Sequence, residues 1–388
     1  MDTQTTDRLR ALDGLRGIAA LVVLLSHVVL ASVGVLTMAD AIGGDPPGAW
    51  WLLLRTPLAV VWAGPELVIV FFVLSGLVLT RAALAAPGGV RPLAFYAGRT
   101  VRLFLPAWAS LLPAAALVVL VPRHVGGGPG TGFWLQAFTE PVDVRQVCSD
   151  LALVVGTHGV TLSGVLWSLR WEVVFSLLLP LVVAAAPVLR RLAAPLVVLL
   201  PAVVLGAGAH ESLRYLPPFG VGVLLALRPD AVAALRERLA GRGVPAAVAV
   251  TAGLLTADLW LPDARTAPGS GGALVVIGAG AAVLLPLVYG GVARGLEARP
   301  VQWLGRRSFS LYLVHEPIVV TLAFALGRPG FGVLLAVALP GSLAAAEVFH
   351  RLVERPAHRL ARSATADLQR RSAARRPAGR AEAGPAGA

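Results

Sequence analysis

The sequence predicts an all-α, polytopic membrane protein with about ten transmembrane helices and both termini in the cytoplasm. Of its 388 residues, 57% are hydrophobic and 14% are charged, whereas a soluble domain carries about 25% charged residues. The mean hydropathy is +0.77. Apolar runs recur along the chain and approach the roughly 20 residues that cross a bilayer core. Arginines fall mainly in alternate connections between these runs, as they do in cytoplasmic loops.

Ten apolar segments are expected to form the spans of one transmembrane domain, residues 1–360. They lie at 15–37, 61–84, 103–122, 164–186, 194–210, 215–228, 244–261, 272–292, 308–326 and 331–354. Prolines inside them are tolerated because neighbouring helices satisfy the freed backbone groups. The remaining 361–388, rich in Arg, Ala, Gly and Pro, are expected to form a disordered, basic cytoplasmic tail.

The net charge of +12 does not indicate nucleic-acid binding, because the arginines lie in short clusters between apolar segments. With the N-terminus inside, most of the 33 basic residues fall on the cytoplasmic side, which predicts a multi-pass protein of the cell membrane. Trp50, Trp51 and Trp134 suit an aromatic belt at the membrane surface.

Metal and disulfide chemistry are not expected. The chain has one cysteine, Cys148, so it holds no internal disulfide framework. Its seven histidines lack the spacing of metal ligands.

Polar residues at depth in the bilayer are costly, so they indicate function. Arg16 and His27 are eleven residues apart, which returns them to within about 20° of one helix face and about 16.5 Å apart along the axis. A neutral histidine near the midplane is a competent general base. The alternative is a buried histidine bonded to a neighbouring helix, with Arg16 only setting topology. Asp13 is expected to cap this helix, to hold Arg16, or both.

Further candidates lie on the next three spans. Ser75 and Gly76 form a small, polar notch that either permits close helix packing or admits a narrow ligand arm. Arg99 and Arg102 share a helix face, which suits phosphate binding or positive-inside topology. Glu172 lies about 12 Å below the outer surface, where it either orients His27 or forms a structural ion pair. Two residues away, Arg170 points to another side, so each needs its own partner.

Late in the chain, His315 and Glu316 lie at a depth similar to His27. A second intramembrane histidine suggests catalysis, although a packed histidine followed by Glu-Pro is also typical of a helix break.

Together these segments resemble the acyltransferase-3 family of integral membrane O-acyltransferases. The matching pieces occur in family order over about residues 8–360, and they are LDGLRGIAALVVLLSH, FFVLSGLVL, RTVR, LWSLRWEVVFSLLLPL, SLYLVHEP and VERP. The fourth piece has Arg-Trp where relatives often carry smaller residues before the glutamate, which leaves the role of Arg170 open.

The resemblance implies an acyl-CoA-dependent transferase, commonly using acetyl-CoA, whose acceptors are usually sugar hydroxyls. It implies that His27 is catalytic and that Arg16 completes its motif. It also implies that Arg99 and Arg102 belong to the donor site with Ser75 and Gly76. Partners would be the donor, a carbohydrate or glycosylated acceptor, and the lipid bilayer.

Two mechanisms stay open, because His27 either deprotonates the acceptor hydroxyl or carries the acyl group itself. One rival is a secondary transporter with His27, Glu172 and His315 as a proton relay. Another is a non-catalytic subunit of a polysaccharide export system.

Overall fold

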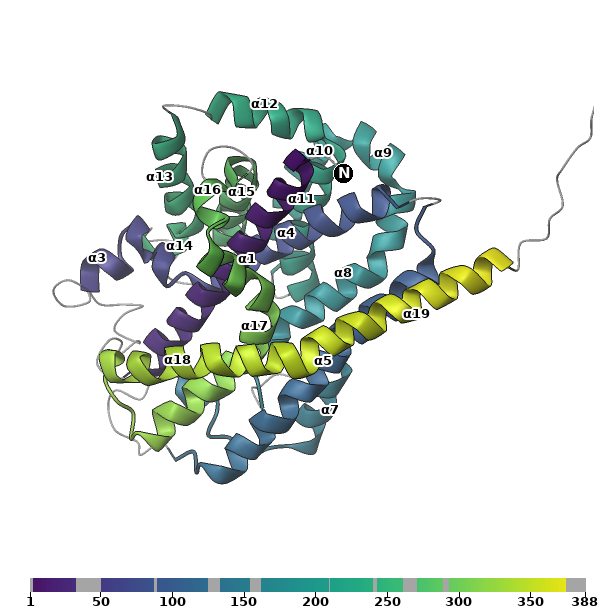
Figure 1. Cartoon of the computed structure of the whole chain (residues 1–388). Helices are drawn as coiled ribbons and strands as arrows, with labels where there is room; N and C mark the ends of the chain where they lie inside the picture. Colours follow the sequence, from purple (N-terminus) through teal and green to yellow (C-terminus); the bar gives the residue numbers. More distant parts are fainter. Residues whose placement is uncertain are drawn as a thin grey trace, which may run out of the picture.

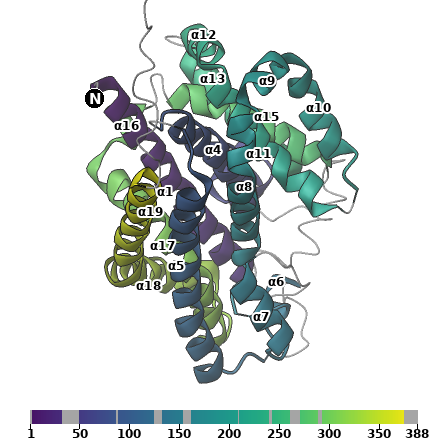
Figure 2. The same ribbon diagram turned by 90° about the vertical axis from the view of Figure 1, so that its right-hand side faces the viewer.

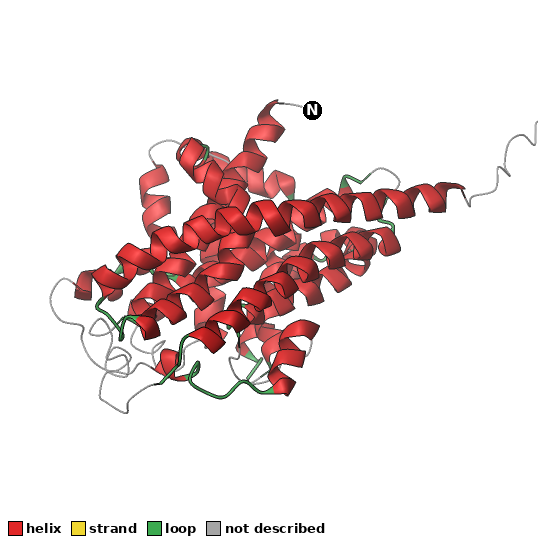
Figure 3. Ribbon diagram, turned by 60° about the horizontal axis from the view of Figure 1, so that its bottom comes forward, coloured by secondary structure: helices red, strands yellow, loops and turns green. Residues whose placement is uncertain are grey.

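The computed structural model describes most of the chain as helix. The described residues are 3–32, 50–86, 89–124, 133–153, 162–208, 210–239, 243–260, 271–288 and 293–374. Within these ranges every regular element is helical (Figures 1 and 3), so the predicted all-α class is confirmed.

Each of the ten predicted segments corresponds to one helix. These are α1 (Thr3–Ala31), α4 (Gly64–Leu84), α5 (Pro92–Leu120), α8 (Leu166–Ala184), α10 (Ala193–Leu205), α11 (Glu211–Leu227), α13 (Val244–Leu255), α15 (Gly271–Val288), α17 (Arg299–Ala325) and α18 (Phe331–Phe349). In the described residues, seven helices are long and apolar enough to span a membrane. An eighth is added if α11 and α12 (Pro229–Leu239), which meet at 89°, form one bent span. Helices α10 and α13 are apolar but shorter, so the count of ten crossings stays a prediction.

Short helices connect these long ones. They are α3 (Trp50–Leu54), the 3-10 turn η1 (Pro57–Val61), α6 (Phe133–Gln136), α7 (Val144–Ala152), α9 (Ala186–Arg191), α14 (Ala257–Trp260) and α16 (Ala293–Leu296).

Three helices begin much earlier than the apolar pattern predicts, namely α1, which starts at Thr3, α5 and α17. Helix α5 starts at Pro92 and α17 at Arg299, each with a proline in its first turn, where proline fits because that turn has no amide partners. The hydropathy pattern detects only the apolar part of each helix. The part of α5 that precedes its apolar run carries Arg99 and Arg102, so both arginines are fixed on a continuous helix.

The C-terminal segment differs from the predicted tail. Helix α19 (Arg355–Ala374) continues the line of α18 through a π-helical turn at His350–Glu354 and lies along α5 (Figures 1 and 2). Ala357 and Ala361 are buried in this contact, and alanine and arginine are good helix formers. Residues 361–374 are therefore helical, while 375–388 lie outside the described residues.

Helices α1 and α17, far apart in the sequence, pack side by side and run in the same direction. A Cβ added at Gly17 would collide with the backbone of Gly305, and one at Gly305 would collide with the carbonyl of Asp13. Gln302 donates hydrogen bonds to the carbonyls of Arg10 (2.6 Å) and Leu296 (2.8 Å). Small residues at such crossings let membrane helices approach closely.

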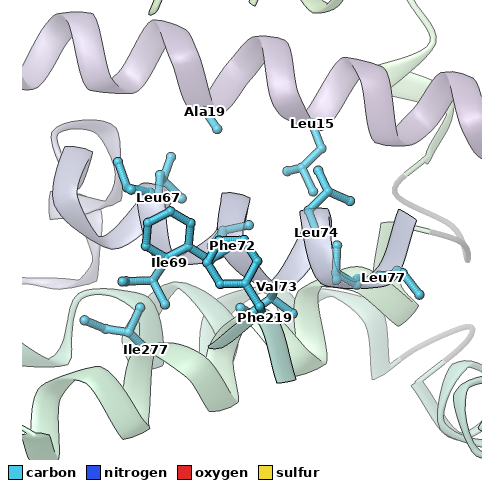
Figure 4. Packing of buried hydrophobic residues seen from close by; sticks show 14 of the residues in the cluster. Leu15, Ala19, Leu67, Ile69, Phe72, Val73, Leu74, Leu77, Phe219 and Ile277 are labelled. Atoms are coloured by element: carbon cyan, nitrogen blue, oxygen red, sulfur yellow. The ribbon is translucent and has the colours of Figure 1, made fainter. Parts of the chain in front are cut away.

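A second close crossing joins α4 to α11. Gly76 faces the Phe219 carbonyl, and Gly222 faces the α4 backbone at Val73. The rings of Phe72 and Phe219 stack with centroids 4.6 Å apart. Figure 4 shows this apolar cluster filling the space between α1, α4 and α11.

Candidate functional site

Two histidines from the α1–α17 crossing meet in a hydrogen bond. His27 Nδ1 lies 2.8 Å from His315 Nε2, and His315 Nδ1 lies 2.9 Å from the carbonyl oxygen of Leu311. His315 is fully buried, and an isolated buried charge is costly, so its imidazole is neutral.

These contacts fix the protons of the pair. Because a carbonyl oxygen only accepts, His315 Nδ1 carries the proton and donates it to Leu311. His315 Nε2 then holds a lone pair and accepts from His27 Nδ1–H. The remaining nitrogen, His27 Nε2, holds a free lone pair when His27 is neutral. The arrangement presents one imidazole nitrogen as a base or nucleophile.

Trp134 completes a stack of three rings. Its ring lies 5.0 Å from that of His27 at an interplanar angle of 18°, and His315 stacks on His27 at 5.0 Å and 10°. Phe138 contacts the Trp134 ring edge-on at 4.9 Å. Trp134 therefore contacts a candidate site residue, a role that its expected place in the aromatic belt does not predict.

Helix α7 fastens the segment that carries Trp134 to the rest of the molecule. The Trp108 indole on α5 donates a 2.8 Å hydrogen bond to the Leu151 carbonyl on α7. The Asp150 carboxylate accepts from the Leu162 amide just before α8, and burial raises the pKa of Asp150 to about 6.

Glu316, next to His315, holds the start of α8. Its carboxylate accepts from the Val165 amide at 3.1 Å and from the Ser163 hydroxyl at 3.4 Å. A Cβ at Gly164 would lie 2.7 Å from this carboxylate. Beyond the end of α5, burial lowers the pKa of Arg123, and the charge of Glu316 opposes that shift. The adjacent residues His315 and Glu316 thus connect α1 and α8 through α17, because His315 contacts α1 and Glu316 contacts the start of α8.

Glu172 and Arg170 on α8 find different partners, as their spacing predicts. Glu172 pairs with Arg99 on α5 at 2.9 Å, and the Ser176 hydroxyl accepts two further hydrogen bonds from the same guanidinium. Arg170 pairs with Glu211 on α11 at 3.3 Å and lies over the Trp171 ring.

A cavity of about 140 Å³ brings together most of the residues singled out in the sequence. Its wall includes five of them, Arg16, Ser75, Arg99, Arg102 and Glu172, together with Ser168, Ser308 and Tyr312. The cavity is lined from α1, α4, α5, α8 and α17, so it lies where the separate motifs converge.

The other candidates lie outside the wall of this cavity. Gly76 faces Phe219 instead, which sets how closely α4 packs on α11. Asp13 pairs with Arg16 at 4.0 Å. Its predicted N-cap role is wrong, because α1 begins ten residues earlier at Thr3. His27 and His315 are also absent from the wall.

Tyr312 connects the cavity to the histidine pair. It lines the cavity, and its ring lies 6.0 Å from that of His315. Its hydroxyl is held by the Ser168 hydroxyl at 2.6 Å and the Val165 carbonyl at 3.0 Å. The position of Tyr312 one helical turn before His315 was the signal in the sequence that could have identified it. No group of three metal-ligating side chains occurs in the parts of the chain that the structure describes.

Comparison with known proteins gives one match. A family model described as an acyltransferase domain matches residues 9–349, and no curated protein or solved structure matches the chain significantly. The matched region ends at the last residue of α18, so α19 lies beyond it.

Proposed function

Because this chain belongs to the acyltransferase-3 family, we propose that it moves an acyl group, most simply acetyl, from cytosolic acyl-CoA to a hydroxyl group. The acceptor we propose is a carbohydrate or a glycosylated molecule. Membership of the family makes the chain a membrane acyltransferase, and its long apolar helices agree with a multi-pass protein. The donor, the acceptor and the residue roles below are the proposal.

The histidine pair is the observation that carries the proposal. With its Nδ1–H directed at His315, His27 keeps the Nε2 lone pair for chemistry. In the direct route, Nε2 takes the proton of the acceptor hydroxyl while its oxygen attacks the thioester carbon. The C–S bond then breaks, and the leaving sulfur takes that proton from Nε2, so that CoA departs as the thiol.

The covalent route uses the same nitrogen differently. His27 Nε2 attacks the thioester, CoA thiolate leaves, and an acyl-imidazole remains. The acceptor hydroxyl then attacks that acyl group, its proton passes by way of the imidazole to the CoA thiolate, and the neutral imidazole is restored. In both routes His315 and Trp134 orient the ring, and His315 takes part only through its hydrogen bond to His27.

The cavity supports a donor path from the arginines toward the histidines. Arg99 is neutralised by Glu172, whereas Arg102 takes part in none of the ion pairs of the described residues. A guanidinium that makes no direct ion pair suits the phosphates of CoA. The slender arm would pass Arg16 and Ser75.

Tyr312 lines the cavity, and its ring lies 6.0 Å from that of His315. We expect its ring to turn aside when the thioester reaches His27.

The same path requires the arginine-lined end to face the cytosol, where acyl-CoA is found. We therefore propose that both termini are cytoplasmic and that the protein lies in the cell membrane, in keeping with the distribution of arginines. The transporter alternative requires Glu172 to lie beside the histidines. Glu172 instead forms an ion pair with Arg99, which does not support a proton relay.

The decisive experiment compares wild type with His27→Ala in purified, reconstituted protein. We expect the variant to bind CoA as wild type does but to lose acetyl transfer, because only the reacting nitrogen is removed. His210→Ala, at an exposed histidine, is the matched control and should keep full activity. Acetyl transfer retained by His27→Ala would refute the mechanism.

A second arm separates the two routes. Incubation with labelled acetyl-CoA and no acceptor should leave label on wild-type protein, but not on His27→Ala, if the acyl-imidazole forms. Label absent from wild type would favour direct transfer.

A further inference from the structure

A second, larger cavity lies between α5 and α19 and adjoins the first. Its volume is about 370 Å³, and it shares Arg99 and Arg102 with the smaller cavity. The ten residues of its wall are Phe95, Gly98, Arg99, Arg102, His358, Ala361, Arg362, Thr365, Ala366 and Gln369. Because two side chains line both spaces, a long ligand could occupy the two together.

The wall of this larger cavity is cationic. Its positive charge comes from three arginines, and none of its ten residues is acidic. Two nearby carboxylates pair with residues of this wall. Glu172 neutralises Arg99, and Glu354 lies 3.8 Å from His358. Arg102 and Arg362 take part in none of the ion pairs of the described residues. The cavity therefore has the chemistry of an anion site.

Specific contacts hold α19 against α5, so the cavity is a built feature. The Thr365 hydroxyl, which donates to the Ala361 carbonyl at 2.8 Å, also lies 3.3 Å from the Ala94 carbonyl on α5. Arg91 donates to the Gln369 carbonyl at 2.7 Å. Gly98 leaves room for Thr365, since a Cβ there would collide with its hydroxyl.

The start of α19 is anchored to α17 as well. Buried Glu354, at the end of the π-helical turn, accepts from Ser310 at 2.5 Å and lies 2.9 Å from His350 Nδ1. Such turns are frequent at functional sites. These contacts of Glu354 fix the position along α5 at which His358 and Arg362 lie.

We infer that α19, which lies beyond the region of the family match, forms part of the donor site. His358 and Arg362, with Arg99 and Arg102, hold the phosphorylated head of acyl-CoA in the larger cavity. The arm then enters the smaller one. The inference rests on the proposed function and adds the sub-site for the head. The volumes agree with this order, because the wide space receives the bulky nucleotide and the narrow one the arm.

The test measures CoA binding to the full-length protein in nanodiscs by titration calorimetry. Arg362→Gln should weaken CoA binding about tenfold or more, because a charge-assisted hydrogen bond to phosphate is lost. Arg362→Lys should recover part of that affinity. Transfer from S-acetyl-pantetheine, a truncated donor without phosphates, should be unchanged by Arg362→Gln.

Arg359→Gln is the matched control, since it removes the same charge from the same helix outside the cavity wall. It should bind CoA as wild type does. Ala366→Phe gives an independent check because it fills the cavity without changing charge, and it should also weaken CoA binding.

The outcomes separate the two proposals. Wild type that binds CoA, with Arg362→Gln and Ala366→Phe binding equally well, would remove α19 from the donor site and leave the proposed function intact. Equal losses in Arg362→Gln and Arg359→Gln would show a general charge effect and would also overturn the inference. Wild type that binds no CoA would overturn the proposed function and this sub-site with it.

Discussion

At the scale of single residues, the geometry around His27 explains how one imidazole can be prepared for reaction without a carboxylate beside it. The buried His315 accepts the Nδ1 proton of His27, because its own Nδ1 is committed to the Leu311 carbonyl. A backbone oxygen therefore sets the orientation of both rings, as the third member of a catalytic triad does in other enzymes.

Trp134 tests whether the ring orientation matters. Trp134→Ala should lower kcat for acetyl transfer about tenfold, because the loss of stacking frees the His27 ring and misplaced groups react slowly. The KM for acetyl-CoA should stay unchanged, since Trp134 lies outside both cavities. Trp51→Ala, at a tryptophan that is 44% exposed, serves as control. Equal kcat values for the two variants would mean that the stack has no part in transfer.

The sequence predicted several residue placements well. The common helix face of Arg99 and Arg102 and the separate partners of Glu172 and Arg170 follow from 100° per residue. Trp134 and Tyr312 could not be found this way, because their contacts join segments that only tertiary packing brings together. Hydropathy also could not show that Gly76 packs on Phe219 while its neighbour Ser75 lines a cavity.

At the scale of elements, the α1–α17 crossing determines whether the histidines meet. Gly17 and Gly305 leave backbone against backbone, and the histidine pair lies further along the same two helices. Any side chain at the crossing would push the helices apart and lengthen the hydrogen bond between the imidazoles.

Gly305→Ala tests whether the close contact at the α1–α17 crossing outweighs the higher helix propensity of alanine. Alanine normally favours a helix by about 1 kcal/mol over glycine, but here its Cβ meets the Asp13 carbonyl. We expect a net loss of about 1–3 kcal/mol, seen as a lower midpoint of thermal unfolding in detergent. Gly332→Ala is the control, because an added Cβ meets no atom within 4 Å there. A higher midpoint for Gly305→Ala would contradict the observed packing.

The hydropathy pattern does not predict the boundaries of helices that begin with polar residues. Apolar runs located the apolar parts of all ten predicted helices, but the segments of α5 and α17 that precede these runs carry no such signal. Helix α19 was not predicted for the same reason. Its buried stripe is made of alanines rather than bulky apolar residues, so its composition resembles that of a disordered tail.

At the scale of the whole molecule, the orientation in the membrane is open to direct test. Cys148 is the single cysteine of the sequence, and it is exposed on α7, in a predicted outer loop. A membrane-impermeant maleimide should label it in intact cells. In a Cys148→Ser background, Ser363→Cys on α19 should be labelled only after the cytoplasmic side is opened. The reverse pattern would invert the topology and move the arginine-lined cavity away from cytosolic acyl-CoA.

The family and the all-α class followed from the order of short motifs and from hydropathy, and both are confirmed. The number of crossings remains a prediction, because α10 and α13 are short and α11 bends sharply into α12. Length and composition do not decide whether such helices cross the bilayer fully.

The parallel pairing of α1 with α17 also bears on biosynthesis. The imidazole on α1 is translated 288 residues before its partner on α17. During that interval the His27 ring lacks its hydrogen-bond partner. On the proposed mechanism, activity therefore requires α17, and a chain that stops before α17 would be inert even with its first motif whole.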